Sequence, residues 1–367
     1  MKRLSILVCL VCLTFTVFSN TSTKDNSLIQ VAFLLDTSNS MDGLIDQAKA
    51  QLWNIANEIS DAKMNGDIVR FEFALYEYGN TKIPKYKQHV RQVAGFTEDM
   101  DLISSQLFAL KTSGGDEYCG QVIHNSLEEL TWKDHAGLKV IYIAGNESFN
   151  QGNYPQDEAC KEARNKEIKI NTIYCGPFDN GISLNWNSGS SLSLGTYNNI
   201  DQNAKTIHID TPYDEELVRL NSLLNETYVS YRTSGRYLKE NQIAQDVNAN
   251  TYLRANYAKR AIFKAKENYK NSSWDLIDAE EEGVNVFEYN DQLPEKLQSS
   301  NKAELEAKVK ALKDKRKSIQ EDISCIAKER EVYIANIKKE QHVENPFETS
   351  ILNSLRAQLT AAGYMVK

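Results

Sequence analysis

Basic charge, cysteine and proline are all scarce in this sequence of 367 residues. It has 42 Lys and Arg against 50 Asp and Glu, a formal net charge of −8, and only six cysteines and six prolines. Without a basic excess, the chain lacks the electrostatic field that attracts DNA or RNA, so we expect no nucleic-acid partner. The five histidines form no His-x-x-x-His pair and match no zinc-ligand spacing.

Motifs that identify common enzyme classes are also missing. No Gly-x-Ser-x-Gly turn is present, which excludes the nucleophile turn of a serine hydrolase. The pair Gly114-Gly115 is not followed by Gly-Lys-Ser/Thr, so it is not a phosphate-binding loop. We therefore expect that the protein is not an enzyme. A hydrolase that uses a cluster of Asp36 and Glu117 with a metal-bound water is the remaining catalytic alternative, although no clear base accompanies them.

The longest wholly apolar run lies at the N-terminus. Lys2 and Arg3 precede residues 4–18, which are too few to span a bilayer comfortably, and small and polar residues follow from Ser19. This pattern predicts a signal peptide over residues 1–19. We therefore expect an exported protein, periplasmic or extracellular, with no membrane span after cleavage. Loss of Lys2 and Arg3 changes the net charge from −8 to −10.

Four cysteines remain after the predicted cleavage, and an oxidising compartment permits disulfides. Cys160 falls in the first turn of a predicted helix and Cys175 ends the following predicted strand, which places both at the same rim of a parallel sheet. We expect a Cys160–Cys175 disulfide, with Cys119 as the rival partner. Cys325 is predicted to be a packed free thiol or an intermolecular bridge.

Apolar runs alternate with helical patterns along residues 28–226. Residues 28–35 form a nearly continuous apolar run, as expected of a strand buried on both faces, and residues 138–145 and 168–176 predict a second and a third buried strand. Residues 68–78 alternate apolar and polar side chains, as a half-buried strand does. Helical patterns separate these runs, for example at 44–59, at 98–110, where the pattern is amphipathic, and at 156–167, where it is polar. A loop is expected at 176–195 and a short strand near 206–210. The order predicts an α/β domain with a doubly wound, mostly parallel sheet.

The pattern changes after about residue 236, and residues 236–367 read as a helical region. A heptad seam runs through residues 302–339: Leu305, Val309, Leu312, Ile319, Ile323, Ile326, Tyr333 and Ile337. Arg316 and Arg330 occupy the two skipped seam positions. The seam indicates either an oligomerising coiled coil or a helix folded back on neighbouring helices of its own chain. A final amphipathic helix is predicted at 346–361.

A carboxylate and two hydroxyls follow the first apolar run at every second position, as Asp36, Ser38 and Ser40. Alternate side chains of a loop can converge on one point, and ligands of doubly wound sheets bind at the carboxyl ends of strands. Such hard oxygen ligands suit Mg²⁺, Mn²⁺ or Ca²⁺. The alternative is that the three side chains only cap the following helix.

This Asp-x-Ser-x-Ser loop, between an apolar strand and an amphipathic helix, resembles the metal-ion-dependent adhesion site of von Willebrand factor type A domains. The resemblance covers residues 28–226. It implies a Rossmann-like fold, a divalent cation, and a protein partner whose carboxylate completes the metal shell. The chain as a whole is similar to exported bacterial type A proteins without an assigned activity.

The other two metal loops depart from the family pattern. Residues 112–120 correspond to the second loop, where Asp116 and Glu117 stand in place of the usual threonine. In the third loop the family has an Asp-Gly pair, whereas Gly145 here takes the Asp position and Asn146 and Glu147 follow it. The resemblance implies that Asn146 or Glu147 substitutes, directly or through water.

Two functions follow as expectations. The first is an exported, non-enzymatic binding protein that holds a protein partner through a divalent cation at the Asp-x-Ser-x-Ser loop. The alternative is a structural protein whose metal site is degenerate and which assembles through its helical region.

Overall fold

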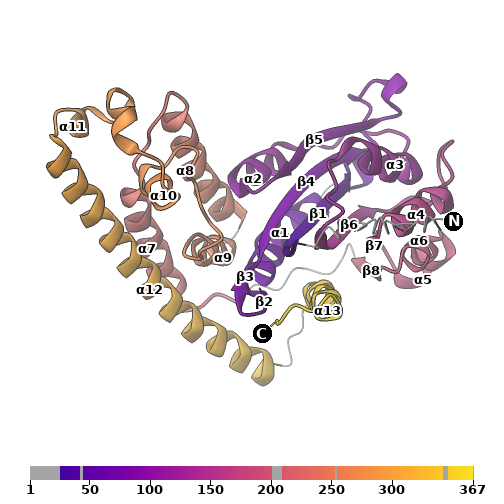
Figure 1. The fold of residues 1–367 in the computed structure, drawn as a ribbon. Coiled ribbons are helices and arrows are strands. Elements are labelled where there is room, and N and C mark those ends of the chain that lie inside the picture. Colours follow the sequence, from indigo (N-terminus) through magenta and orange to yellow (C-terminus); the bar gives the residue numbers. More distant parts are fainter. Residues whose placement is uncertain (1–24, 42–43, 201–208, 253, 342–345, 367) are drawn as a thin grey trace, which may run out of the picture.

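The computed structural model describes residues 25–41, 44–200, 209–252, 254–341 and 346–366 (Figure 1). The predicted signal peptide, residues 1–19, lies outside the described residues, as does most of the strand expected near 206–210.

A six-stranded sheet forms the centre of the α/β part, with the strand order β5-β4-β1-β6-β7-β8. The strands are β1 (Asp25–Asp36), β4 (Arg70–Tyr78), β5 (Val90–Thr97), β6 (Ala136–Gly145), β7 (Ile168–Cys175) and β8 (Tyr197–Ile200). All neighbouring strands are parallel except β4 and β5, which are antiparallel. The prediction of a doubly wound, mostly parallel sheet is confirmed. The strands β2 (Lys63–Met64) and β3 (Asp67–Ile68) form a separate two-stranded sheet.

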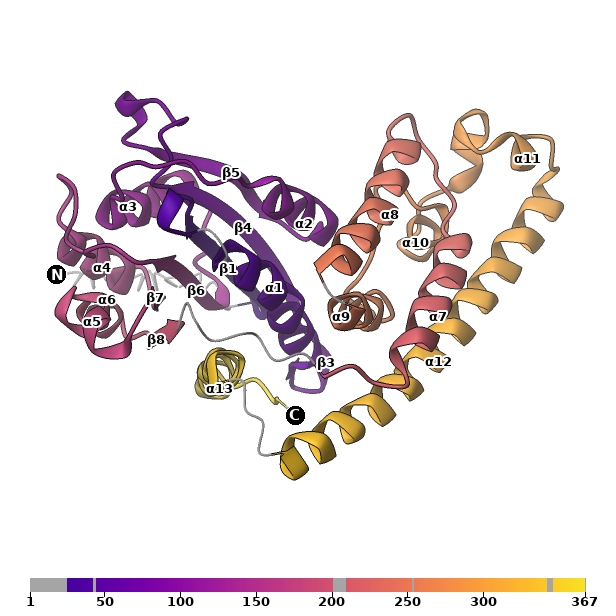
Figure 2. The same cartoon turned by 180° about the vertical axis from the view of Figure 1, so that it is seen from behind.

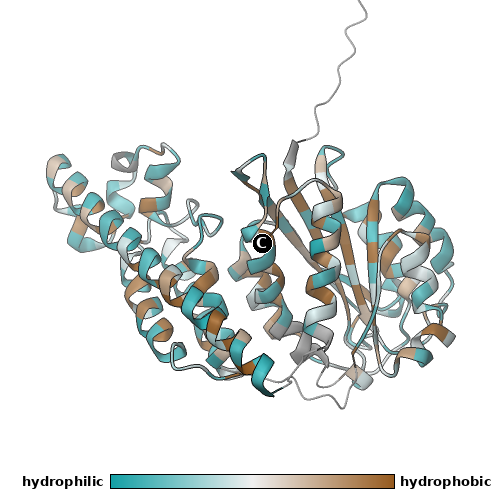
Figure 3. Cartoon of the chain, turned by 90° about the horizontal axis from the view of Figure 1, so that it is seen from below, coloured by the Kyte–Doolittle hydropathy of each residue, from teal (hydrophilic) through white to brown (hydrophobic). Residues whose placement is uncertain are grey.

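Both faces of the sheet are buried, as the continuous apolar runs predict. In β1, Ile29 and Val31 belong to the core on one face, whereas Ala32 and Leu34 belong to the core on the other. The first face packs against α1 (Leu44–Asp61), α2 (Met100–Ala109) and α13 (Pro346–Ala361). The second packs against α3 (Cys119–Glu129), α4 (Gln156–Asn165) and α6 (Trp186–Leu192). Hydrophobic residues are dense along these strands in Figure 3.

The stretch 176–195, expected as a loop, instead contains two short helices, α5 (Phe178–Ser183) and α6. Its Gly, Ser and Asn content is unfavourable for a helix, so tertiary packing decides the outcome. Trp186 is fully buried and contacts the ring of Phe149 at a centroid distance of 4.9 Å. The burial of this large side chain anchors α6 against the sheet.

The predicted disulfide between Cys160 and Cys175 is not formed, since both cysteines are free, as are Cys119 and Cys325. Cys160 packs in the core on the α3 and α4 face, whereas Cys175 packs in the core on the α1 face. The prediction was wrong because it placed both residues at one rim without considering on which face of β7 the Cys175 side chain lies.

Helices make up the described part of the chain after β8. They are α7 (Asp214–Thr227), α8 (Gly235–Tyr252), α9 (Arg254–Lys264), α10 (Leu276–Glu281), the 3₁₀ segment η3 (Val286–Gln292), α11 (Glu295–Gln298), α12 (Lys302–Gln341) and α13. The long heptad-patterned helix is confirmed as α12, which spans 40 residues and lies alongside α7 (Figure 1). Among the helices of the described residues, none is both long and apolar enough to cross a membrane.

Four of the eight seam residues of α12 are buried within their own chain, and the other four are partly buried. Ile319 and Ile323 join the core shared with the sheet, whereas Leu305 and Val309 pack in a smaller cluster with residues of α10. The skipped position Arg316 is also buried and bonds to carboxylates of other segments. The structure therefore shows the folded-back arrangement, and these seam residues are not available to a second chain.

The final helix, α13, returns to the sheet (Figure 2). Its residues Ile351, Leu355 and Leu359 belong to the core on the α1 face of the sheet. Arg356 forms a two-pronged ion pair with Glu58 of α1, with N–O distances of 2.6 and 2.7 Å. The C-terminal end of the chain therefore completes the hydrophobic core of the α/β part.

Candidate functional site

Three loops meet where β1, β4 and β6 end. Of the predicted ligands, Asp36 is the last residue of a strand, and the others lie in the loops. Asp36 is the last residue of β1 and pairs with Tyr78, the last residue of β4. We call Asp36, Ser38, Ser40, Glu117 and Asn146 the oxygen cluster. Its members come from three separate segments of the chain, and the fold brings them together.

The first loop has the convergence that its alternating pattern predicts. The backbone N–H of Ser38 donates to Oδ1 of Asp36 at 2.7 Å. The hydroxyls of Ser38 and Ser40 share a hydrogen bond of 2.8 Å. The Ser40 hydroxyl also donates to Oδ1 of Asn146 at 3.1 Å, which links the first loop to the third.

In the second loop, Glu117 rather than Asp116 joins the cluster. Glu117 is only 4% exposed, its side chain adjoins Asp36, and its backbone N–H donates to Oε1 of Gln151 at 2.8 Å. Asp116 is exposed and accepts a hydrogen bond of 3.0 Å from the Tyr118 hydroxyl. The two acids of this loop therefore have different surroundings, and only Glu117 is placed to act with Asp36.

The third loop contributes Asn146 to the cluster and Glu147 to its edge. Glu147 is exposed, and its carbonyl accepts a hydrogen bond of 2.8 Å from Nε1 of Trp186. Its negative charge still acts on the cluster, since it contributes to raising the pKa of both Asp36 and Glu117. Glu147 is thus a peripheral acid of the site.

The absence of a carboxylate at position 145 has a steric explanation. A Cβ on Gly145 would lie 2.5 Å from the Tyr78 hydroxyl oxygen and 3.0 Å from the Trp186 ring. The Tyr78 hydroxyl in turn donates to the Ala144 carbonyl at 2.9 Å. Tyr78 and Trp186 therefore fill the space in which the family's aspartate would begin. Tyr78 was not predicted from the sequence, and nothing in its strand pattern distinguishes it.

Two carboxyl groups, those of Asp36 and Glu117, are buried side by side at the centre of the cluster. Burial raises the pKa of Asp36, and burial together with the neighbouring Asp36 carboxyl raises the pKa of Glu117. Oδ2 of Asp36 is buried and has no hydrogen-bond partner within the described part of the chain. A buried carboxylate oxygen without a partner is costly, and a cation would relieve that cost.

The donors of the cluster fit a hard divalent cation. They comprise two carboxylates, two hydroxyls and an amide oxygen, the ligand types preferred by Mg²⁺, Mn²⁺ and Ca²⁺. Across the described residues, no group of three or more His, Cys, Asp or Glu side chains is suited to hold a metal. A cation here would therefore depend on the hydroxyls of Ser38 and Ser40 as well as on the acids.

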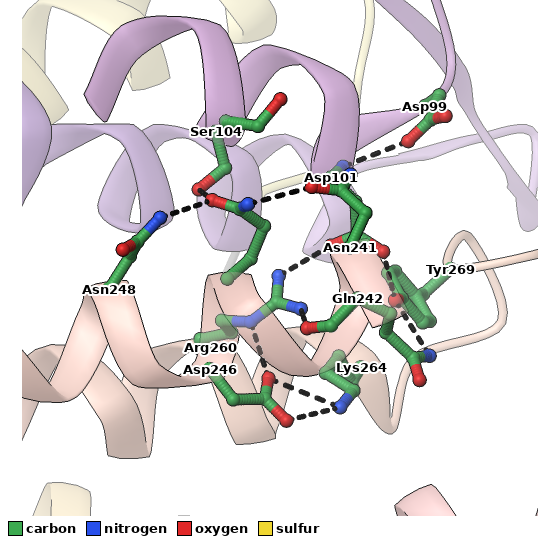
Figure 4. Close-up of polar contacts among 12 residues, drawn as sticks. Asp99, Asp101, Ser104, Asn241, Gln242, Asp246, Asn248, Arg260, Lys264 and Tyr269 are labelled. Carbon is green, nitrogen blue, oxygen red and sulfur yellow. Dashed lines mark hydrogen bonds and ion pairs between the residues drawn. The ribbon is translucent and has the colours of Figure 1, made fainter. Parts of the chain in front are cut away.

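A second buried charge cluster joins α2 to the helical region (Figure 4). Arg260 of α9 bonds Asp101 of α2 at 2.7 Å and Asp246 of α8 at 2.6 Å. Lys264 pairs with the same Asp246 at 3.0 Å, and the Tyr269 hydroxyl donates to Asp101 at 2.6 Å. The carboxylates are matched by cations, in contrast to those of the oxygen cluster.

This second cluster fixes the helix that leads into the second loop. After α2 ends at Ala109, the loop that carries Glu117 begins. The sequence does not reveal the cluster, because charged residues within helical patterns read as solvated faces. Its members become recognisable only when α2, α8 and α9 pack together.

A third buried cluster holds α12. Arg316 bonds Asp275 at 2.8 Å and Asp278 at 2.6 Å, with its guanidinium 4.1 Å from the centre of the Tyr228 ring. One arginine here faces two carboxyls. Burial and the neighbouring Asp275 raise the pKa of Asp278 to about 7, although Arg316 opposes the shift and Glu281 adds to it.

We expect the free energy of unfolding to fall with rising pH because of Asp278. Its folded pKa of about 7 lies above the ordinary 3.8, so the folded state binds the proton more tightly and this stabilisation is lost between about pH 4 and 7. The slope reaches at most about 1.4 kcal/mol per pH unit for one group. Urea unfolding of wild type and Asp278→Asn across this range measures it. The variant should show a shallower decline, and equal slopes would contradict the assignment.

Comparisons with known proteins found matches only among solved structures, since no family model and no curated protein matches the chain. BatB from Bacteroides thetaiotaomicron is 15% identical, with 47% of this chain and 90% of that chain covered and a TM-score of 0.37. The Rpn10 VWA domain is 14% identical, with 48% and 90% covered and a TM-score of 0.36. An aerotolerance-related membrane protein from Bacteroides fragilis is 13% identical, with 47% and 92% covered and a TM-score of 0.33. Each of these matches covers about half of this chain.

Proposed function

We propose that the protein is an exported, non-enzymatic binding protein whose oxygen cluster holds a divalent cation and, through it, a carboxylate of a protein partner. The observation that carries this proposal is the buried, unpartnered Oδ2 of Asp36 beside the buried carboxyl of Glu117. Two acids without a matching cation are costly to fold, unless an ion or a proton neutralises them.

Asp36, Ser38, Ser40 and Glu117 would hold the ion, with Asn146 and Glu147 at its side. When bound, the ion would supply a positive charge that accepts a carboxylate from outside the chain. Without the ion, the acids of the site would repel an acidic partner. The proposal therefore makes partner binding dependent on the cation, and export rests on the predicted signal peptide.

The alternative structural role would need a surface other than the α12 seam. Four seam residues, Leu305, Val309, Ile319 and Ile323, pack inside the chain, against the sheet core and the cluster around α10. No specific contact in the described residues favours assembly through the helices.

Cation binding should stabilise the fold measurably. A ligand at about a hundred times its Kd adds about 2.7 kcal/mol to the free energy of unfolding, since it binds the folded state alone. Urea unfolding of residues 20–367 in Mg²⁺, Mn²⁺ or Ca²⁺, with and without chelator, tests the proposal. We expect at least one cation to raise the unfolding midpoint and chelator to reverse it. Identical curves in all cations and in chelator would contradict it.

A further inference from the structure

The connection between β4 and β5 forms a projecting hairpin beside the oxygen cluster. We call residues 79–89 the lysine hairpin, and Figure 1 shows this connection extending past the end of the sheet. Its root is Gly79, where an added Cβ would lie 2.7 Å from Oδ1 of Asp36 and 2.9 Å from Cγ of Glu117. The hairpin therefore starts in direct contact with the two acids of the site.

Hydrogen bonds tie this hairpin to both the first and the second loop. The Asn80 amide donates to the Thr37 hydroxyl at 3.2 Å and to the Lys111 carbonyl at 2.9 Å. The Thr81 N–H donates to the Gly114 carbonyl at 3.0 Å. The hairpin is therefore attached to the site by hydrogen bonds, and the first and second loops fix its position.

The end of the hairpin that leads into β5 has an unusual backbone conformation. Gln88 and His89 have φ values of +52° and +55°, in the left-handed region that residues other than glycine seldom adopt. His89 is buried, and its Nδ1 lies 3.0 Å from the Ile83 carbonyl, to which it donates. Ile83 is itself buried and anchors the tip of the hairpin, although the residues on either side of Ile83 are exposed.

The tip presents positive charge and an aromatic ring to solvent. Lys82, Lys85 and Lys87 are all exposed, within six residues of a chain whose net charge is −8. Tyr86 between them is 82% exposed, the largest value among the exposed large apolar side chains of the described residues. Tyrosine is enriched among residues that dominate binding energy at interfaces.

We propose that the lysine hairpin is a second contact surface for the partner, and that the partner presents an acidic polypeptide segment. This inference rests on the proposed function and names the chemistry of the partner. One carboxylate of the segment would engage the cation site, while neighbouring carboxylates meet Lys82, Lys85 and Lys87 and the chain packs on Tyr86. Charge complementarity identifies the occupant, because only an anionic segment gains from both the cation and the lysines.

A protein segment fits better than a nucleic acid. Asp116 and Glu147 are exposed at the same end of the sheet and would repel a continuous phosphate backbone. Three lysines are also few for nucleic-acid binding, in which contacts to many phosphates provide most of the affinity. A short acidic segment can place its carboxylates between these acids and the lysines.

Binding of a fluorescein-labelled poly-glutamate peptide to residues 20–367 in Mn²⁺ tests the inference by fluorescence anisotropy. We expect the triple variant Lys82→Gln, Lys85→Gln, Lys87→Gln to weaken binding about tenfold, since each exposed ion pair contributes only modestly, and to reduce the salt dependence of binding. Tyr86→Ala should weaken binding by a similar factor. All four side chains are exposed, so these variants should fold.

A matched control removes the same charge elsewhere. Lys310, Lys317 and Lys328 are exposed on α12, and their triple Gln variant should bind the peptide as the wild type does. Equal weakening by both triple variants would show a general charge effect and overturn the inference. Tighter binding of single-stranded DNA of similar length would also overturn it.

The outcomes separate the two proposals. Peptide binding that needs Mn²⁺ but ignores the hairpin variants overturns this inference and supports the cation site. Peptide binding that needs the lysines but survives chelator overturns the cation-dependent function and supports the hairpin as an acid-binding surface.

Discussion

Arg260→Ala should lower the free energy of unfolding by about 3–5 kcal/mol, the loss typical when one partner of a buried ion pair is removed. Arg260 is fully buried between Asp101 and Asp246. Its removal leaves Asp101 without its cation and Asp246 with Lys264 alone. Burial raises the pKa of Asp246, but the positive charges of Lys264 and Arg260 outweigh that effect and hold the pKa at about 2. Urea unfolding at neutral pH measures the loss.

The matched control for this prediction is Arg219→Ala. Arg219 also bonds a carboxylate through two nitrogens, to Glu216 of the same helix, but both side chains are largely exposed. Exposed pairs contribute little, because water already solvates both charges. We expect no clear loss of stability in this variant. A loss in Arg260→Ala no larger than in the control would contradict a structural role for the buried cluster.

Gly79→Ala should weaken cation binding by about 10- to 100-fold, the range typical of changes to residues that support metal ligands. The added Cβ would overlap Oδ1 of Asp36 and Cγ of Glu117, at 2.7 and 2.9 Å. One of the carboxylates must then move away from the position that the strand ends give it. Titration of Mn²⁺ into the folded variant measures the change in affinity.

Gly66→Ala separates this effect from backbone strain. Gly66 also has a positive φ, +92° against +75° for Gly79, but an added Cβ there meets nothing within 4 Å. Both variants should lose stability from the left-handed backbone, whereas only Gly79→Ala should lose cation affinity. Equal Mn²⁺ affinities in the two variants would contradict the placement of Asp36 and Glu117 around one site.

The sequence predicts the sheet well because its strands obey simple rules. A strand covered on both faces is apolar at most positions, as the buried parts of β1 and β6 are, and parallel strands need helices between them. The same topology places the end of β1 at a ligand-binding edge, so Asp36, Ser38 and Ser40 could be recognised before the structure. Their mutual hydrogen bonds agree with that expectation.

Contacts between distant segments could not be predicted in the same way. The choice of Glu117 over Asp116 depends on which of two adjacent side chains turns inward, and loop composition does not determine this. The role of Arg316 as a buried partner of Asp275 and Asp278 is likewise invisible in a heptad pattern, where it appears as a flaw. Predicting the face of the sheet on which the Cys175 side chain lies requires the register of β7. The sequence does not give that register, so the disulfide was predicted wrongly.

The central claim is that the oxygen cluster binds a divalent cation, and calorimetric titration of Mn²⁺ into residues 20–367 tests it most directly. Wild type, Asp36→Ala and Asp116→Ala should be compared, since Asp116 is an acid of the same site region that bonds Tyr118 instead of facing Asp36. We predict chelator-reversible binding by wild type and Asp116→Ala, and none by a folded Asp36→Ala. No heat of binding in the wild type, or equal binding by Asp36→Ala, would contradict the claim.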